Sequence, residues 1–284
     1  LHTAYRRQRQ MCIRDRDKLV KYYEREFIKL GGEVKYKTKV DKILVEAELP
    51  LGLPDEPYFW QKSKATGIKT NEKNIYSEKI IVATGVWANQ LLDPLGINSY
   101  QKPKKRQLFT IQAETKELNE LLYVKGLNKE DCLPLTIFPS PRVYIRPDVE
   151  EKAFWIGYAD DFNRPFHLEE DPQPEENYYR YGMYPVLTAY MPQFKNINPI
   201  NAWAGEYAIN TYDGQPVIFE EHNIIVAGAA SGSGIMKADA IGRITAALYN
   251  GEEEAELFNG ERFKVSDLGT VSYTHLTLPT ICSV

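Results

Sequence analysis

Apolar and polar positions follow two different spacings in the first third of the chain. Between Lys18 and Leu30 the apolar residues recur every three to four positions, which predicts a helix, and Gly31-Gly32 stops it. Alternate residues are then apolar or β-branched, which predicts a strand over Glu33–Val45. The polar stretch that follows, residues 62–79, predicts a hairpin or a surface loop.

Two short runs are apolar at every position, Ile80-Ile81-Val82 and Ile224-Ile225-Val226-Ala227. A continuous apolar run is typical of a strand that is buried on both faces of a parallel sheet. Glycines follow each run, and the second run leads into a helix that we expect from about Ile235 to Tyr249. These runs therefore predict α/β structure at two separate places in the chain.

The middle of the chain has a different pattern. Short strand-like runs alternate there with polar loops, at Gln107–Gln112, Leu135–Phe138, Val143–Arg146 and Phe154–Tyr158. A helix is expected over Pro174–Met191. The pattern predicts an antiparallel sheet inserted between the α/β pieces, so the fold class is α/β plus antiparallel β. Such an arrangement favours a cofactor domain that carries a substrate-binding domain.

The two ends of the chain are encodable as one inverted DNA repeat. A back-translation of Arg6–Asp15 has a reverse complement that reads as Val271–Thr280. The string resembles a transposon adapter used to build sequencing libraries. We therefore expect residues 1–16 and 270–284 to be adapter-derived tails, and residues 17–269 to be a biological segment that is open at both ends. A basic targeting arm at the N-terminus is the alternative, but it leaves the matching C-terminus unexplained.

Composition and charge exclude several classes of function. Hydrophobic residues at 43% and charged residues at 26% are typical of a globular chain. Taking the five Arg and one Asp of residues 1–16 from 35 basic and 39 acidic residues leaves a net charge of −8, which argues against a nucleic-acid surface. Neither long apolar run could span a bilayer. We expect a cytoplasmic protein.

Cysteine and histidine are too sparse for a disulfide scaffold or a metal cluster. Between residues 17 and 269 the chain has one cysteine, Cys132, and two histidines, His167 and His222, which are far apart in sequence. We therefore expect no bound metal.

Three motifs follow one another in a fixed order. The first is the strand Ile80–Val82 with Ala83-Thr84-Gly85-Val86-Trp87, the second is the loop region from Trp203 to Ile218, and the third is the glycine-rich turn from Gly228 to Met236. In this order they resemble the C-terminal part of the FAD-dependent oxidoreductases of the glycine oxidase, sarcosine oxidase and D-amino acid oxidase family. The nearer resemblance is to the branch called FAD-dependent oxidoreductase domain-containing protein 1.

The resemblance implies a set of FAD contacts. The helix that begins near Ile235 would direct its positive N-terminal dipole at the isoalloxazine edge that becomes negative on reduction. The implied cofactor residues are Val40, at the end of the Glu33–Val40 strand, together with Ala83, Thr84, Gly85, Trp87, Gly232, Ser233, Gly234, Ile235 and Met236. The implied domains are an FAD-binding domain from residues 17–100 and 209–269, and a substrate-binding domain from residues 101–208.

The sequence also departs from the family pattern. It has no Gly-x-Gly-x-x-Gly turn, so the N-terminal βαβ unit of the Rossmann-like domain is missing, which we attribute to truncation. The stretch Gly205–Ala208 contains no cysteine where sarcosine oxidases attach their flavin, so the FAD should be noncovalent. Ala208 itself stands where glycine and D-amino acid oxidases carry an Arg that binds the substrate carboxylate.

Other residues could replace that Arg. In the Val143–Arg146 strand, alternation places Tyr144 and Arg146 on one face, where they could hold a carboxylate or could simply be solvated. Lys237 and Arg142 are further candidates. The expected function is oxidation of a C–N bond in a small amine or amino acid by hydride transfer to FAD. Oxidation of a 2-hydroxy acid and a flavoprotein assembly factor without turnover are the alternatives. The sequence does not indicate an oligomeric state.

Overall fold

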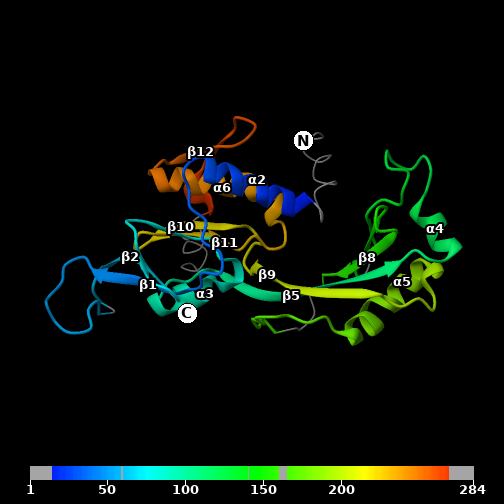
Figure 1. The fold of residues 1–284 in the computed structure, drawn as a ribbon, viewed down its shortest axis with the longest axis horizontal. Coiled ribbons are helices and arrows are strands. Elements are labelled where there is room, and N and C mark those ends of the chain that lie inside the picture. The colour runs from blue at the N-terminus through cyan, green and yellow to red at the C-terminus, as the bar shows by residue number, and fades with distance from the viewer. Residues whose placement is uncertain (1–14, 59, 140, 160–164, 269–284) are drawn as a thin grey trace, which may run out of the picture. The chain divides into compact units, whose positions relative to one another are not determined.

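The computed structural model describes residues 15–268 except 59, 140 and 160–164 (Figure 1). The tails expected at 1–16 and 270–284 lie outside the described residues, apart from the backbone of Asp15 and Arg16. The chain divides into two compact units. Unit 1 comprises the chain up to Gln101 and from Ala208 on, and unit 2 comprises Lys102–Tyr207.

Unit 1 contains the helices α2 (Asp15–Lys29), α3 (Ala88–Leu92) and α6 (Gly234–Asn250). Its strands are β1 (Val40–Ala47), β2 (Ser63–Thr70), β3 (Asn74–Tyr76), β4 (Ile80–Val82), β10 (Val217–Glu221), β11 (Ile224–Gly228), β12 (Glu254–Glu256) and β13 (Arg262–Lys264). Two long strands, β5 (Gln101–Gln112) and β9 (Asn201–Asn210), carry the chain between the units.

The first predicted helix is confirmed as α2, and it ends where the glycines stop it. Gly31 has a φ of 92°, a left-handed conformation that favours glycine. The Gly32 amide donates to the Phe27 carbonyl at 2.9 Å and the Gly31 amide to the Ile28 carbonyl at 3.0 Å. These bonds satisfy the last carbonyls of the helix.

The first half of the predicted Glu33–Val45 strand is wrong. Among the described residues no strand pairs with residues 33–39, and Lys37 has a φ of 55° that breaks the extended backbone. Strand β1 begins at Val40, which pairs with Thr70 of β2, so Val40 starts a strand rather than ending one. Alternation alone predicted a strand, but a strand also needs a neighbour to satisfy its backbone groups. The predicted hairpin at 62–79 is confirmed as β2 and β3, which complete the sheet β1-β2-β3.

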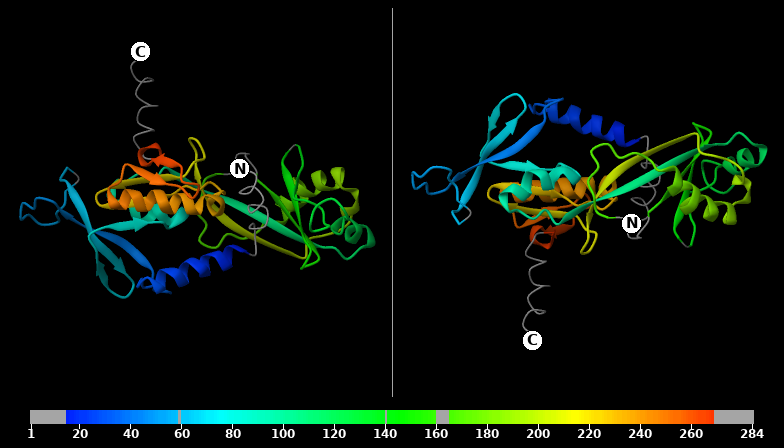
Figure 2. Two further views of the ribbon diagram at one scale, coloured as in Figure 1. Left: turned by 90° about the horizontal axis from the view of Figure 1, so that it is seen from above. Right: turned by 90° about the horizontal axis from the view of Figure 1, so that it is seen from below.

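The two apolar runs are strands of a parallel sheet, as the sequence predicted, and the structure shows that they pair with each other. Strand β4 pairs with β11 in parallel register, and β10 pairs with β11 antiparallel. Helix α6 runs along one face of this small sheet (Figure 2), where Ile218 packs with Ile244 and Ala247. The opposite face packs Val82 and Val226 against residues of β1 and α3.

One face of β4 is more open than expected. Ile81 is 48% exposed, so β4 is not buried on both faces. The reason is that β4 is the last strand of the sheet β10-β11-β4 among the described residues. Ile81 lines an open apolar cavity of about 570 Å³ together with Ala83, Ala227 and the α6 residues Gly234 and Ile241.

Unit 2 is built on a five-stranded sheet with the strand order β6-β7-β8-β5-β9. It contains β6 (Thr136–Ile137), β7 (Val143–Asp148), β8 (Ala153–Tyr158), α4 (Lys116–Leu122) and α5 (Tyr184–Tyr190). The pairs β6–β7, β7–β8 and β5–β8 are antiparallel, as the sequence predicted.

The core of unit 2 lies on one face of this sheet. It contains Val143, Ile145, Phe154 and Ile156 from the strands, together with residues of the helical segments such as Met183, Leu187 and Phe194. A π-helical turn at Tyr178–Met183 leads into α5, where Pro185 cannot donate an α-helical hydrogen bond. No helix in the described part of the chain is long and apolar enough to cross a membrane.

Candidate functional site

In unit 1, two loops meet at one edge of the small sheet. Strands β4 and β11 are parallel, so the loops that follow them, at Ala83–Gly85 and Ala229–Ser231, leave from the same edge. The side chain of Gln101 joins these loops. Its Nε2 donates to the Gly85 carbonyl at 2.7 Å, and its Oε1 accepts from the Ala229 amide at 2.9 Å. Gln101 is 2% exposed, and no sequence signal pointed to it.

The loop after β11 holds an unusual backbone conformation. Ala229, Ser231 and Gly232 have φ values of 55°, 49° and 81°. Non-glycine residues adopt such values rarely, and the surrounding structure must maintain them. Here the Asn210 amide donates to Ser231 Oγ at 3.0 Å, and the Ser231 amide donates to the Ala208 carbonyl at 2.9 Å. The turn is therefore held by the end of β9.

This turn delivers the chain to the N-terminus of α6. Ser233 is the N-cap, but its side chain accepts no capping hydrogen bond. No described residue accepts a hydrogen bond from the amides of Gly234 or Ile235. Ile235 and Met236 are 39% and 51% exposed beside these amides. Free amides at the positive end of a helix, next to exposed apolar side chains, can bind a planar group with a negatively polarised edge.

The structure brings together most of the residues that the resemblance implied for FAD. Ala83, Thr84, Gly85 and Trp87 follow β4, and Gly232 to Met236 follow β11, at the same sheet edge. Gly85 has a φ of 56°, and Trp87 is 45% exposed. Val40 belongs to the other sheet of the same unit, β1-β2-β3.

In unit 2, Tyr144 and Arg146 lie on the face of the sheet opposite the core. Val143 and Ile145 are fully buried in the core cluster, so the alternate residues of β7 lie on the other face. The Tyr144 ring lies across Gly157 of β8, its cross-strand partner. A Cβ at position 157 would overlap that ring and would lie 2.8 Å from Leu108 Cδ2. Glycine at this position therefore allows Tyr144 to lie over β8.

Arg146 lies against an aromatic surface without a counter-charge. Its cross-strand partner is Trp155, and its Cζ lies 6.0 Å from the centre of the Trp155 ring. Trp155 meets Trp203 of β9 edge to face, with ring centres 4.5 Å apart. The Arg146 side chain makes no hydrogen bond or ion pair with any described residue, and its Nη1 is buried. A half-buried guanidinium without a carboxylate is costly unless an anion binds to it.

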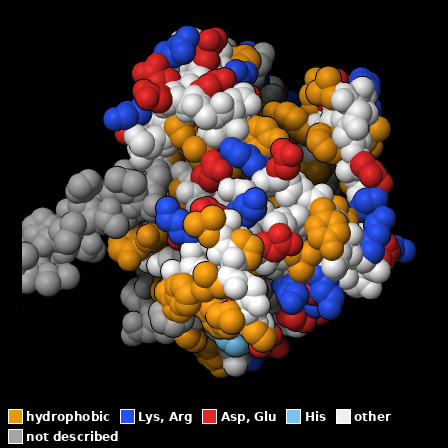
Figure 3. Space-filling model, turned by 90° about the vertical axis from the view of Figure 1, so that its left-hand side faces the viewer, with side chains coloured by type: hydrophobic (Ala, Val, Ile, Leu, Met, Phe, Trp, Pro, Cys, Tyr) orange, Lys and Arg blue, Asp and Glu red, His pale blue; other side chains and the backbone are white. Residues whose placement is uncertain are grey.

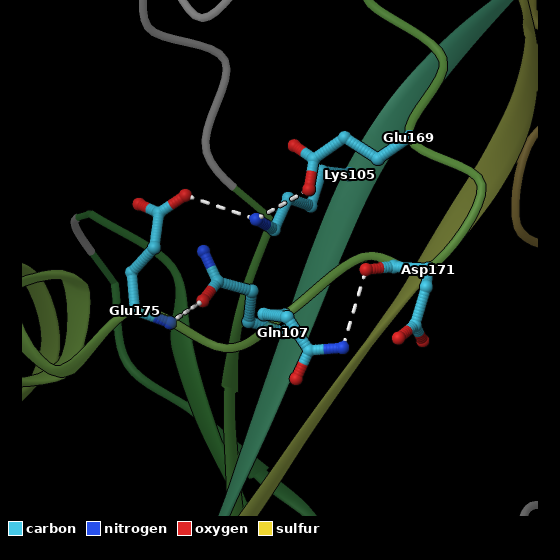
Figure 4. Close-up of polar contacts among 6 residues, drawn as sticks. Lys105, Gln107, Glu169, Asp171 and Glu175 are labelled. Atoms are coloured by element: carbon cyan, nitrogen blue, oxygen red, sulfur yellow. Dashed lines mark hydrogen bonds and ion pairs between the residues drawn. The ribbon is translucent and has the colours of Figure 1, made fainter.

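A second group of polar side chains in unit 2 surrounds Lys105 and Gln107 of β5 (Figure 4). The buried Lys105 Nζ bonds to Glu169 at 2.9 Å and to Glu175 at 3.1 Å. Burial lowers the pKa of Lys105, but its bonds to the two carboxylates raise that pKa above the usual value. Gln107 Oε1 accepts from the Glu175 amide, so β5 holds the segment around 169–175 at two points.

Glu206 lies near this charge cluster as a third carboxylate. Neither of its oxygens has a well-formed hydrogen bond to a described residue, and both are buried. Burial raises the pKa of Glu206, and the Glu169 charge raises it further. The Glu169 amide, Lys105 and His167 lower it, but the net shift is upward. The sequence did not single out Glu206 for this environment.

Lys237 and Arg142 are the remaining candidates. Lys237 belongs to unit 1, where its Nζ donates to Gln215 Oε1 at 3.0 Å. Arg142 is exposed in the turn before β7. Cys132 is buried, and burial raises the pKa of its thiol. The described residues contain no group of three or more His, Cys, Asp or Glu side chains that could hold a metal ion.

Comparison with known proteins identifies the family. A model of the FAD dependent oxidoreductase family (DAO) matches residues 2–248. The chain belongs to this family. FAD is the cofactor of the DAO family, and the glycine-rich edge and free amides at α6 are compatible with it. The structure resembles L-proline dehydrogenase from P. horikoshii, with a TM-score of 0.63 and 22% identity, over 87% of this chain and 57% of that one.

Curated relatives and a further solved structure are also similar to the chain. FAD-dependent oxidoreductase domain-containing protein 1 from Bos taurus is 25% identical over 178 residues, which cover 60% of this chain and 35% of the relative. The Drosophila melanogaster homolog is 26% identical over 70% of this chain and 34% of its own length. Glycine oxidase from Bacillus cereus has a TM-score of 0.51 at 20% identity, over 81% of this chain and 54% of that chain. The chain thus spans about a third of the length of these curated relatives.

Proposed function

We propose that the chain is part of an FAD-dependent oxidoreductase that oxidises the C–N bond of an amino acid or a small amine. The observation that carries this proposal is Arg146, a half-buried guanidinium that has no counter-charge among the described residues and lies against Trp155. An Arg in this setting is suited to a carboxylate, which its planar fork can bind with two hydrogen bonds. Two structural relatives are named for their action on proline and on glycine, which are both amino acids.

The residues of each unit have separate roles in this proposal. In unit 1, the amides of Gly234 and Ile235 and the loop from Ala83 to Gly85 would hold FAD without a covalent bond, and Gln101 keeps the two loops together. Bound FAD would supply the two-electron acceptor for the substrate. In unit 2, Arg146 would hold the substrate carboxylate and Tyr144 would limit its position. Holding the substrate in one orientation lowers the entropic part of the barrier.

The test uses a longer form of the protein that retains FAD. It is mixed without oxygen with amino acids, with amines and, separately, with 2-hydroxy acids, and the visible flavin absorbance is recorded. Bleaching by amino acids or amines supports the proposal. Bleaching by 2-hydroxy acids alone favours the second reaction on this fold. No bleaching by any of the three classes, with large protein subunits co-purifying, favours an assembly role.

Arg146 provides the residue test. Arg146→Ala should lower kcat/KM by roughly 30- to 1000-fold, or about 2–4 kcal/mol, because the substrate carboxylate would lose its charged partner. Arg146→Lys should recover only part of the loss, since an ammonium cannot reproduce the two-pronged contact. The FAD content should not change in either variant. Arg142→Ala is the matched control, because Arg142 is exposed in the preceding turn, and kcat/KM should stay within about twofold. A similar value for Arg146→Ala would remove Arg146 from the site.

A further inference from the structure

Two tryptophans of unit 2, Trp155 and Trp203, follow Arg146 in a row on the same face of the sheet. Trp155 lies beside Arg146 on β8, and it pairs with Thr110 of β5 on its other side. Trp203 of β9 then meets Trp155 edge to face at 4.5 Å, with 78° between the ring planes. A cation and two indoles therefore form a continuous strip on one face of the sheet. Both rings keep part of their surface exposed.

This strip is separate from the hydrophobic core. The core cluster of unit 2 lies on the opposite face, and neither Trp155 nor Trp203 belongs to it. The Trp155 Nε1 is buried and has no hydrogen-bond partner among the described residues. A buried indole usually finds an acceptor for this group, and leaving it without one costs free energy. Packing of the unit therefore does not account for two indoles and an unpaired guanidinium side by side.

One class of ligand matches such a strip. The Arg146 guanidinium can bind an anionic group such as a carboxylate. The Trp155 N–H needs a nearby acceptor, and the second oxygen of the same carboxylate can supply one. Apolar groups of a ligand can pack against the faces and edges of the two indoles. A molecule with one carboxylate and a bulky apolar body satisfies both requirements, whereas glycine satisfies only the first.

We infer that Trp155 and Trp203 receive the apolar side chain of the substrate whose carboxylate Arg146 holds. The inference rests on the proposed function, and it makes the preferred substrate an amino acid with a bulky apolar side chain rather than glycine. Trp203 is then a specificity-determining residue. Its removal should change the choice between substrates and leave carboxylate binding itself intact.

The experiment measures binding of two probe carboxylates, acetate and phenylacetate, to the 284-residue chain by titration calorimetry. Phenylacetate should bind at least about tenfold more tightly than acetate. Trp203→Ala should reduce the affinity for phenylacetate to the level of acetate and leave the affinity for acetate unchanged. Arg146→Gln should weaken both probes. Phenethylamine, which has the same apolar body and a positive charge, should not bind.

Two further variants keep the test decisive. Trp203→Phe retains an aromatic ring and should preserve most of the preference for phenylacetate over acetate. This variant keeps the test informative if Trp203→Ala does not fold. Trp60→Ala removes an exposed tryptophan of unit 1 that stacks on Tyr58, and both affinities should stay as in the parent chain. Equal affinities for the two probes, or a preference that survives Trp203→Ala in a folded chain, would overturn the inference.

The outcome can be separated from that of the proposed function. If an FAD-loaded longer form is not bleached by any amino acid, the proposed reaction fails, while a Trp203-dependent preference for phenylacetate would still support the binding strip. If amino acids do bleach the flavin, the ratio of kcat/KM for leucine over glycine should fall at least about tenfold in Trp203→Ala. An unchanged ratio would overturn the inference and leave the proposed reaction standing.

Discussion

At the scale of single residues, Gly157 has the sharpest steric requirement on the proposed substrate face. Gly157→Ala would place a Cβ 2.2 Å from Tyr144 Cζ and from its hydroxyl oxygen, and 2.8 Å from Leu108 Cδ2, so the ring or the strand must move. We expect a loss of about 1–3 kcal/mol in the free energy of unfolding, which is typical of an overpacked site. Chemical denaturation monitored by circular dichroism measures it.

Gly205 of β9 provides the control for this prediction. A Cβ at position 205 would meet no atom within 4 Å, so Gly205→Ala should leave stability within about 0.5 kcal/mol of the parent. Tyr144→Phe combined with Gly157→Ala should recover at most part of the loss, because the added Cβ would overlap Cζ of the ring as well as the hydroxyl oxygen. Equal stability of Gly157→Ala and Gly205→Ala would show that Tyr144 does not lie over position 157.

Glu206 predicts a pH dependence of stability. Its pKa is raised in the folded chain, mainly by burial, so the folded state holds the proton more tightly than the unfolded state does. The corresponding stability is present below the unfolded pKa of Glu, about 4.3, and is lost as pH rises through the raised folded pKa. Glu206→Gln stays neutral at every pH. We therefore expect a higher Tm for Glu206→Gln than for the parent at pH 7, and a smaller difference at pH 4.

The matched variant for this pH series is Glu176→Gln. Glu176 is exposed, so the Tm of Glu176→Gln should follow that of the parent across the range. A parallel Tm profile for Glu206→Gln and the parent between pH 4 and 7 would contradict the assignment of Glu206 as a poorly solvated carboxylate.

The residue scale also shows how far sequence reasoning reaches. Alternation along β7 predicted that Tyr144 and Arg146 share a face, because a strand repeats every two residues. It could not reveal that Trp155 and Trp203 join them, since that depends on strand order and cross-strand register. Gln101 was equally invisible, because its two hydrogen-bond partners lie 16 and 128 residues away in sequence.

At the scale of elements, the turn into α6 makes a prediction about FAD. A Cβ at Gly234 would lie 3.0 Å from the Ala230 Cβ, so a branched side chain would strain the turn that places the free amides. In a longer form of the protein that retains FAD, Gly234→Val should strongly lower the bound flavin. The flavin-to-protein absorbance ratio after gel filtration measures this. Gly205→Val is the control and should leave the ratio unchanged, and a near-normal ratio in Gly234→Val would argue against this loop as part of the FAD site.

Elements were predicted well where the pattern and the pairing agreed. The strands β4 and β11, the hairpin at 62–79 and the helix α2 all follow from local spacing and glycine stops, but the pairing of β4 with β11 came from the structure. The strand expected at Glu33–Val40 was a wrong prediction. Alternation is a local pattern, and no strand among the described residues pairs with residues 33–39. The exposure of Ile81 has a similar origin, since sequence does not say which strand ends a sheet.

The loop between β1 and β2 exposes several apolar side chains. The segment between β1 and β2 exposes Leu49, Leu51, Leu53 and Trp60, and Figure 3 shows hydrophobic side chains gathered on the face of the molecule that carries it. The Glu56 carboxylate accepts hydrogen bonds from the Leu51 and Leu53 amides, and these bonds lower the pKa of Glu56. An ordered loop therefore presents these leucines, although nothing in the structure shows what covers them.

At the scale of the whole molecule, the buried clusters respect the division into units. The core that contains Phe154 and Phe194 draws all its buried members from unit 2, and the two other cores draw theirs from unit 1. A unit with its own core can unfold separately from its neighbour. We expect the segment 102–207, expressed alone, to show a cooperative thermal transition by circular dichroism.

Matched core variants extend this prediction to the whole chain. Phe154 and Leu92 are both fully buried, the first in unit 2 and the second in unit 1. Phe154→Ala should cost about 3–5 kcal/mol and Leu92→Ala about 2–5 kcal/mol, since each leaves a cavity. In calorimetry of the 284-residue chain, Phe154→Ala should lower one transition and Leu92→Ala the other. A single transition that both variants lower alike would mean that the two cores unfold as one, so that a loss of stability in the core of unit 2 would also be felt at the α6 turn of unit 1.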